Sequence, residues 1–175
     1  MKKLFILALS VVWLCGNDSI DLPVSFSGSF EQIVTNPKKK VIRYNGDVKF
    51  VFPSIMRWDY EEPTQKEVCS DGENITVVDH DLEQVSIYYL NKKFDVAKIL
   101  SKAKHYKDNI YIAKYQDKDY TIALDKKGRV QSMAYYDDMD NMVQIVFKKV
   151  NYKKRPFKSH IMKCNFPKDY DIIRG

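Results

Sequence analysis

The sequence lacks the residue patterns that enzymes and metalloproteins usually need. It has three histidines and three cysteines in 175 residues, and none of them stands at a metal-binding spacing. It contains no glycine-rich phosphate loop, no Gly-x-Ser-x-Gly elbow and no His-Glu-x-x-His pair. The acidic residues at 137–140 lack the alternation, central glycine and closing glutamate of a calcium loop. The sequence therefore predicts a protein that is not an enzyme and that has no cofactor and no metal site.

Long apolar runs are also scarce, and the one that exists lies at the start of the chain. Lys2 and Lys3 precede an apolar run at 4–14 that only Ser10 interrupts. The run has about the length of a signal-peptide core and is too short for a membrane anchor. We expect residues 1–16 to be an export signal and residues 17–175 to form a single domain.

The cysteines leave two questions open. Cleavage after Gly16 would release a soluble chain, whereas lipidation of Cys15 would produce a lipoprotein. A lipidation motif normally has a small residue before its cysteine, and Leu14 is large, so we favour cleavage. Cys69 and Cys164 then remain, and an oxidising compartment permits one disulfide between them.

The positive charge is spread along the chain. The formal net charge is +6, and lysines alternate with acids through most of the sequence. A nucleic-acid-binding face would cluster its charge, so we expect no nucleic-acid partner. The basic runs at 38–40 and 153–155 each stand beside a proline in an expected loop.

Period-2 alternation of apolar and polar residues dominates the sequence. It is clearest at 48–52 and 56–60, and Asp71-Gly72 separates two further β-rich runs in the manner of a hairpin. About ten such runs are present, including one at 159–166, which favours a barrel or a strongly curved sheet. Residues 94–104 instead repeat their apolar side chains at helical spacing.

Several of these segments together resemble the LolA family of outer-membrane lipoprotein carriers. They are a strand that ends in a proline (46–53), an aromatic strand that precedes another proline (56–63), a Ser-Asp-Gly hairpin (70–72), an Asp-His-Asp-Leu-Glu-Gln-Val segment (79–85), a first strand (26–32), a helix (94–100) and a closing segment (166–173). The resemblance covers nearly the whole mature chain. It implies an incomplete antiparallel β-barrel of about ten or eleven strands, with short lid helices that cover an apolar cavity.

The resemblance also implies a function. Members of this family bind the acyl chains of lipoproteins that an inner-membrane ABC transporter complex releases. They carry these lipoproteins through the periplasm of Gram-negative bacteria to an acceptor at the outer membrane, where one is present. Such a carrier is expected to be a monomer. Water cannot host acyl chains, so the carrier must supply an apolar site.

The resemblance and the alternation together predict which residues contact acyl chains. These residues are Val48, Phe50, Phe52, Met56, Trp58, Phe94, Ala97, Leu100 and Met133. Periodicity alone would make them ordinary core, and the resemblance favours the cavity. Family members often have an arginine before the proline of the second strand, where this chain has Phe52. The nearby Arg57 is expected on the face opposite Trp58.

Two other functions stay open at this point. Lipidation of Cys15 would favour the outer-membrane acceptor, LolB, which shares the fold. A non-catalytic periplasmic interaction module could instead bind a protein or an anionic polymer through lysines.

Overall fold

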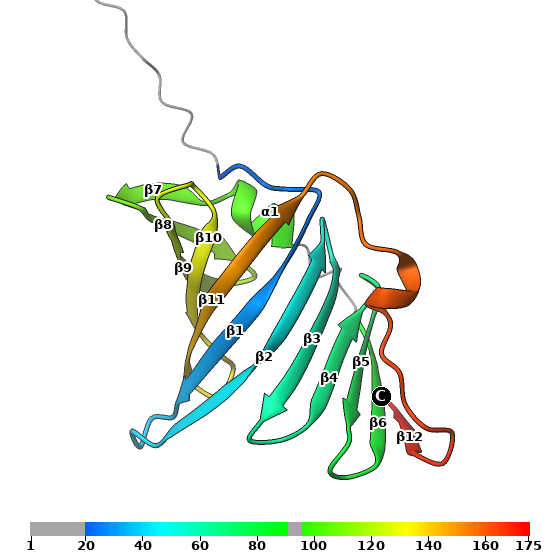
Figure 1. Ribbon diagram of the computed structural model, residues 1–175. Coiled ribbons are helices and arrows are strands. Elements are labelled where there is room, and N and C mark those ends of the chain that lie inside the picture. The colour runs from blue at the N-terminus through cyan, green and yellow to red at the C-terminus, as the bar shows by residue number, and fades with distance from the viewer. Residues whose placement is uncertain (1–19, 91–95) are drawn as a thin grey trace, which may run out of the picture.

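Most of the described part of the chain forms β-strands, in which apolar and polar side chains alternate. The computed structural model describes residues 20–90 and 96–175, which form one bent sheet of twelve strands (Figure 1). The strands are β1 (Ser25–Thr35), β2 (Val41–Val51), β3 (Ile55–Glu62), β4 (Lys66–Ser70), β5 (Asn74–Asp79), β6 (Gln84–Tyr89), β7 (Lys104–Lys107), β8 (Ile110–Tyr115), β9 (Lys118–Leu124), β10 (Val130–Tyr136), β11 (Met142–Lys153) and β12 (Asp171–Arg174). The expected export signal (1–16), Cys15 and Phe94 lie outside the described residues.

The sheet does not close into a barrel. Its strand order is β12-β6-β5-β4-β3-β2-β1-β11-β10-β9-β8-β7, so β12 and β7 are two free edges. This confirms the half-open architecture. The expected count of ten or eleven strands was wrong, because β7 and β12 have only four residues each and are too short to show alternation. The β12–β6 pair is also parallel, unlike every other pair in the described sheet.

The predicted hairpin at Asp71-Gly72 joins β4 to β5. Gly72 has a φ of +90°, which a residue with a Cβ atom rarely adopts. The Asp71 carboxylate accepts hydrogen bonds from the backbone N–H groups of Glu73 (2.9 Å) and Asn74 (2.7 Å). The hairpin stands where the sequence predicted it, and the Asp71 side chain fixes the turn.

Helix α1 (Val96–Ser101) lies against one face of the sheet, which we call the inner face (Figure 1). Ile99 and Leu100 pack there against Ala113 and Ile122, and all four are almost fully buried. The expected set of lid helices is not seen, because α1 is the only helix that the described residues place on this face. The helical pattern ran to residue 104, but Lys104 already begins β7.

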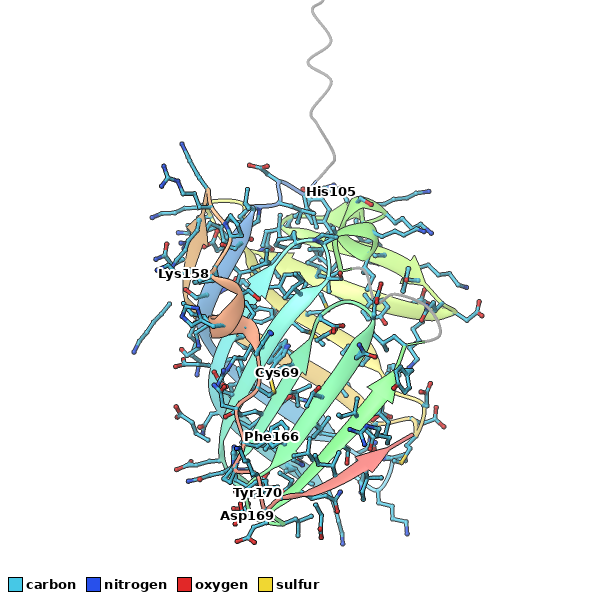
Figure 2. All side chains as sticks on the ribbon, turned by 90° about the vertical axis from the view of Figure 1, so that its right-hand side faces the viewer. Cys69, His105, Lys158, Phe166, Asp169 and Tyr170 are labelled. Carbon is cyan, nitrogen blue, oxygen red and sulfur yellow. A yellow bond between two sulfur atoms is a disulfide. The ribbon has the colours of Figure 1, made fainter. Side chains whose placement is uncertain are left out.

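The predicted strand at 159–166 was wrong. Residues 154–170, which we call the strap, run across the opposite, outer face of β3–β6 and include a short 3₁₀ helix, η1 (Ser159–Met162) (Figure 2). Met162, Cys164 and Phe166 alternate along the strap, and all three line a pocket between the strap and the sheet. The alternation therefore reflects contact with a sheet face and not pairing within the sheet.

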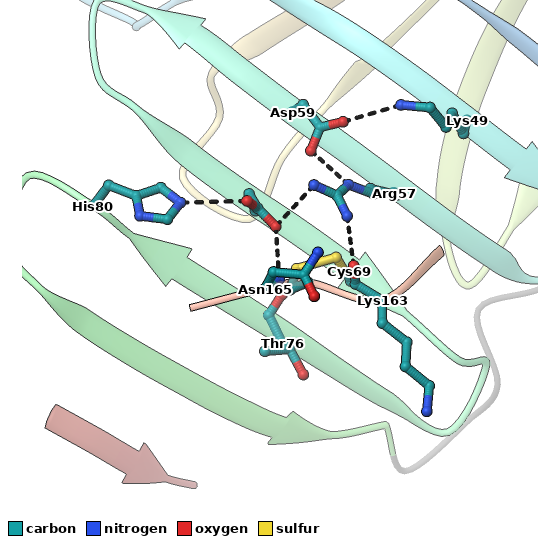
Figure 3. The surroundings of a disulfide bond; sticks show 10 residues. Lys49, Arg57, Asp59, Cys69, Thr76, His80, Lys163 and Asn165 are labelled. Atoms are coloured by element: carbon teal, nitrogen blue, oxygen red, sulfur yellow. Dashed lines mark hydrogen bonds and ion pairs between the residues drawn. A yellow bond between two sulfur atoms is a disulfide. The ribbon is translucent and has the colours of Figure 1, made fainter. Parts of the chain in front are cut away.

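A disulfide bond between Cys69 of β4 and Cys164 fastens the strap to the outer face (Figure 3). The two cysteines are separated by 95 positions in the sequence. The sequence left this pairing open, and the fold brings the two residues together because the strap crosses β4.

Arg57 provides a second fastening beside the disulfide (Figure 3). Its guanidinium group lies 2.7 Å from the Asp59 carboxylate and 3.1 Å from that of Glu67, and it donates a 2.5 Å hydrogen bond to the Lys163 carbonyl oxygen. Asp59 also pairs with Lys49, at 3.3 Å. Arg57 thus lies on the face opposite Trp58, as the strand alternation predicted, and it holds the strap.

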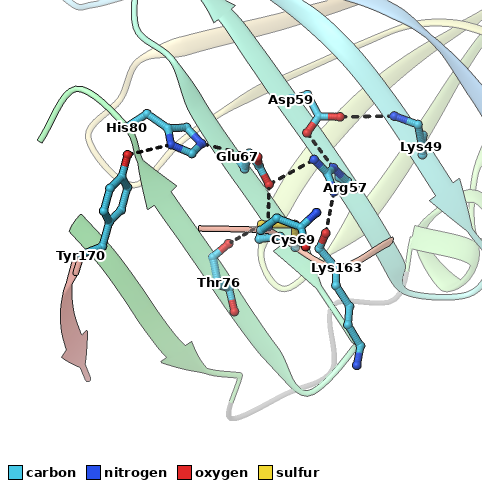
Figure 4. A network of polar contacts seen from close by, with 11 residues as sticks. Lys49, Arg57, Asp59, Glu67, Cys69, Thr76, His80, Lys163 and Tyr170 are labelled. Carbon is cyan, nitrogen blue, oxygen red and sulfur yellow. Dashed lines mark hydrogen bonds and ion pairs between the residues drawn. A yellow bond between two sulfur atoms is a disulfide. The ribbon is translucent and has the colours of Figure 1, made fainter. Parts of the chain in front are cut away.

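The same network extends to the last strand. Glu67 accepts a hydrogen bond from the Asn165 backbone N–H (3.1 Å) and lies 3.4 Å from His80 Nε2 (Figure 4). His80 Nδ1 lies 3.2 Å from the Tyr170 hydroxyl, just before β12. Polar contacts therefore follow the strap from Lys163 to the start of β12.

No helix within residues 20–90 and 96–175 combines the length and the hydropathy that crossing a bilayer requires.

The disulfide should stabilise the fold substantially, because it closes a loop of 95 residues in the unfolded chain. Replacing both cysteines (Cys69→Ser with Cys164→Ser) should lower the free energy of unfolding by about 2–4 kcal/mol in urea denaturation. A reductant should lower the parent to the value of the variant and leave the variant unchanged. Equal stability of parent and variant without reductant would contradict the assignment.

Arg57→Met should release the strap, because the partly buried carboxylates of Asp59 and Glu67 would lose their shared cation. The Arg57 side chain is only 15% exposed, so we expect a loss of about 3 kcal/mol and faster hydrogen exchange at 163–166. Arg43→Met is the matched control, since Arg43 also pairs with a glutamate but is 62% exposed. It should cost less than about 1 kcal/mol. Unchanged exchange in the strap of Arg57→Met would refute its fastening role.

Candidate functional site

Aromatic rings from four neighbouring strands meet on the inner face. The strand register forces this, because Phe26 of β1 stands opposite Phe50 of β2, and Val48 of β2 stands opposite Trp58 of β3. The ring contacts, by centroid distance, are Phe50–Phe52 (4.7 Å), Phe26–Phe50 (5.7 Å), Phe26–Phe147 (5.9 Å), Trp58–Phe147 (6.0 Å), Phe30–Trp58 (4.7 Å), Phe30–Tyr60 (5.0 Å) and Tyr44–Tyr60 (5.8 Å). The result is a continuous band of rings from Phe52 to Tyr44, which we call the aromatic band.

Gly46 makes room for this band. It stands opposite Phe30 on one side and Tyr60 on the other, where the register between β2 and β3 shifts. A Cβ atom on Gly46 would lie 1.9 Å from the Asp59 carbonyl oxygen, so no larger residue fits without backbone movement. The glycine thus permits the close approach of the rings of Phe30 and Tyr60.

The structure places the predicted contact residues at two depths. Val48 (1% exposed), Phe50 (3%), Met56 (8%) and Leu100 (1%) are buried. Phe52, Ala97, Trp58 and Met133 are half-buried. Phe52 and Met133 pack against the cluster beneath α1, and Trp58 packs against the neighbouring cluster around Phe30 and Val48. The set therefore comprises a floor of buried side chains and a more exposed layer above it.

Helix α1 covers only part of the inner face. Its buried side chains, Ile99 and Leu100, form a closed core with Ala113 and Ile122 of the strands beneath it. Farther along the sheet, several apolar side chains of the inner face are only half-buried: Phe26, Trp58, Tyr60, Val68, Ile75, Val77 and Phe147. This second region is apolar surface that α1 leaves uncovered.

Sequence reasoning missed several members of that region. Phe147 alternates with Val143 and Ile145 on β11 and faces inward opposite Phe30, but Met142 and Val146 on the other side of β11 are also apolar, so alternation did not single it out. Val68 and Val77 pair across β4 and β5, and each is followed by another nonpolar residue, Cys69 or Val78, so alternation did not single them out. The family resemblance instead favoured residues on β2 and β3, where the alternation of apolar and polar side chains is clearest.

The inner face is weakly polar around the aromatic band. Burial raises the pKa of the Tyr60 phenol far above its ordinary value, and burial likewise raises the pKa of Tyr135. The Tyr60 hydroxyl donates a 2.8 Å hydrogen bond to the Gln32 side-chain oxygen. At the ends of β4 and β5, Lys66 and Asp79 pair with each other at 3.1 Å. Charge is thus kept neutral or paired, as suits an apolar ligand.

The outer face offers a second apolar space. A pocket of about 490 Å³ lies between the strap and the sheet and is lined by Val51, Ile55, Met162 and Phe166 beside the disulfide. Glu67 and the two sulfur atoms gather within 4.8 Å nearby. Because Cys69 and Cys164 are bonded to each other, they offer no thiolate to a metal ion.

Known proteins are similar to this chain in sequence or in fold. The family model described as outer membrane lipoprotein carrier protein LolA matches residues 24–108. The outer-membrane lipoprotein carrier protein of Campylobacter jejuni is 31% identical over 99% of this chain and all of its own length. That of Wolinella succinogenes is 32% identical over 71% of this chain and 72% of its own length, and that of Helicobacter pylori is 32% identical over 86% and 80%.

A solved structure supports the fold alone. An uncharacterised conserved protein from Thermus thermophilus superposes with a TM-score of 0.54, at 10% identity, over 88% of this chain and 92% of its own. The sequence match to full-length carrier proteins is the stronger finding. On that match, this chain belongs to the LolA family of outer-membrane lipoprotein carrier proteins.

Proposed function

We propose that this chain carries lipoproteins through the periplasm by binding their acyl chains against its inner face. The observation that carries the proposal is the apolar region that extends across β1–β6 and β11 and that α1 leaves uncovered. Family membership supports the cargo, since the relatives are named outer-membrane lipoprotein carrier proteins.

The physical requirement matches the size of this face. Each acyl methylene that leaves water contributes about 0.8 kcal/mol, and a lipoprotein has two or three acyl chains. A carrier must offset most of that cost outside the membrane. A broad wall of rings does so, and the thioether side chains of Met56 and Met133 adapt to irregular chains.

We assign the contact residues by their depth. Phe52, Trp58, Ala97 and Met133 contact acyl chains directly, joined by the half-buried residues that the fold adds: Phe26, Tyr60, Val68, Val77 and Phe147. Val48, Phe50, Met56 and Leu100 form the floor beneath them. Phe94 stays a predicted contact residue and lies outside the described residues.

The remaining roles follow from the family. The chain would be exported by residues 1–16, act in the periplasm of a Gram-negative bacterium as the monomeric domain 17–175, and perform no catalysis. It would receive lipoproteins from an inner-membrane ABC transporter complex and deliver them to an outer-membrane acceptor. The disulfide supports an oxidising compartment.

Cys15 favours one alternative. If it carries lipid, the chain is anchored and acts as an acceptor of the LolB type. The intact mass of the protein purified from the periplasm separates the two, because lipidation adds a diacylglyceryl group and cleavage after Gly16 removes Cys15.

Native mass spectrometry tests the cargo. Protein purified gently from periplasm should retain lipopeptide or lipoprotein, and the complex should dissociate to the mass of the bare chain on activation. A folded protein that never retains acylated material would count against the carrier and favour a periplasmic interaction module.

Trp58→Glu should abolish carriage, because an ionised carboxylate among acyl chains is costly to desolvate. We expect the release of lipoprotein from spheroplasts to fall by about tenfold or more, which corresponds to about 1.4 kcal/mol or more of lost binding. Tyr136→Glu is the matched control, since Tyr136 is an exposed aromatic residue on the outer side of β10. Circular dichroism must show that both variants are folded. If folded Trp58→Glu releases lipoprotein as well as the parent does, the assignment of Trp58 fails.

A further inference from the structure

Acidic residues are absent from the segment that comprises β11 and most of the strap. From residue 142 to residue 168 the chain has no aspartate or glutamate, although both occur frequently elsewhere. The same segment has eight cations: Lys148, Lys149, Lys153, Lys154, Arg155, Lys158, Lys163 and Lys168. The even spread of charge that the sequence suggested therefore does not hold here.

Four of these cations gather where β11 passes into the strap. Lys153, Lys154, Arg155 and Lys158 surround a shallow, open depression of about 660 Å³, together with Pro156, Phe157, His160 and Ile161. All four cations are exposed. We call this set of residues the basic corner, and Lys158 marks its position in Figure 2.

The charge of the basic corner is uncompensated. Among the residues that the structure describes, none of these four cations forms an ion pair, whereas the nearby Lys148 pairs with Glu31 at 2.9 Å. Lys153 instead places its ammonium group 4.3 Å from the centre of the Phe157 ring. The four cations thus remain available to an external anion.

The backbone of the basic corner is held in place. Ser25, which is fully buried, donates a 2.7 Å hydrogen bond from its hydroxyl group to the Arg155 carbonyl oxygen. Farther along, the disulfide at Cys164 and the hydrogen bond from Arg57 to Lys163 fix the strap. A preorganised cationic surface loses little backbone entropy when it binds.

We propose that the basic corner docks the protein on membrane surfaces that contain anionic phospholipids. The cations would pair with headgroup phosphates, and Phe157 and Ile161 would enter the interface between headgroups and acyl chains. The apolar side chains among the cations favour a bilayer over an acidic protein or a nucleic acid, since an aromatic ring suits the headgroup level. This docking does not depend on acyl binding at the inner face.

Co-sedimentation with vesicles tests the proposal on the mature chain. The parent should bind vesicles of equal parts phosphatidylglycerol and phosphatidylcholine, and it should not bind pure phosphatidylcholine. Each cation near an anionic surface contributes about a fivefold factor, and the glutamates add repulsion, so the triple variant Lys153→Glu, Lys154→Glu, Arg155→Glu should bind at least about 100-fold more weakly. Salt at about 1 M should abolish binding, because the Debye length falls to about 3 Å.

The chain supplies a matched control. Lys38, Lys39 and Lys40 are also three exposed cations in a row beside a proline, in the turn between β1 and β2 at the other end of these strands (Figure 1). Their triple change to glutamate alters the net charge equally and should weaken binding by no more than about threefold, since screening confines the effect to nearby charges. An equal loss of vesicle binding in both triple variants would contradict a specific role for the basic corner and would show that net charge alone governs binding.

Two further results bear on the proposal. Trp58→Glu should bind anionic vesicles as the parent does, which separates docking from acyl binding; loss of vesicle binding in that variant would place the lipid contact at the inner face and overturn the proposal. If the folded parent binds neither kind of vesicle at about 0.15 M salt, the membrane is excluded and an acidic protein becomes the better partner.

Discussion

The structure depends on a sheet that is apolar on both faces and does not close. Such a sheet exposes apolar surface unless other parts of the chain cover it. The outer face of β3–β6 is covered permanently, because the strap is fastened there by the disulfide and by Arg57. The inner face is covered by α1 only at the β8–β10 side. The remaining inner surface is the one that a transient apolar ligand can occupy.

The strap combines two properties on opposite sides of one segment. Met162 and Cys164 face the sheet and seal it, while Lys158 and the preceding cations face solvent. This division explains why the segment alternates like a strand without pairing as one. The positive charge of the strap has no acidic partner within the segment, because residues 142–168 include no aspartate or glutamate.

The sequence predicted the direction of side chains better than their depth. Alternation placed Arg57 on the face opposite Trp58, and Asp71-Gly72 gave the hairpin. It could not show that Val48 is buried while Trp58 is half-exposed, because depth depends on the curvature of the sheet and on the position of α1. Phe147 was missed because β11 also has apolar residues, Met142 and Val146, on its other side. The short edge strands β7 and β12 contain too few residues for any period to emerge.

Acyl chains could be bound on the inner face, as we propose, or in the outer pocket of about 490 Å³. Photo-crosslinking of a diacylated lipopeptide with a photoreactive group in its acyl chain decides between them. We expect adducts on inner-face residues such as Trp58, Tyr60 and Phe147, mapped by mass spectrometry of the digested protein. Adducts confined to Ile55, Met162 and Phe166 beneath the strap would contradict binding on the inner face.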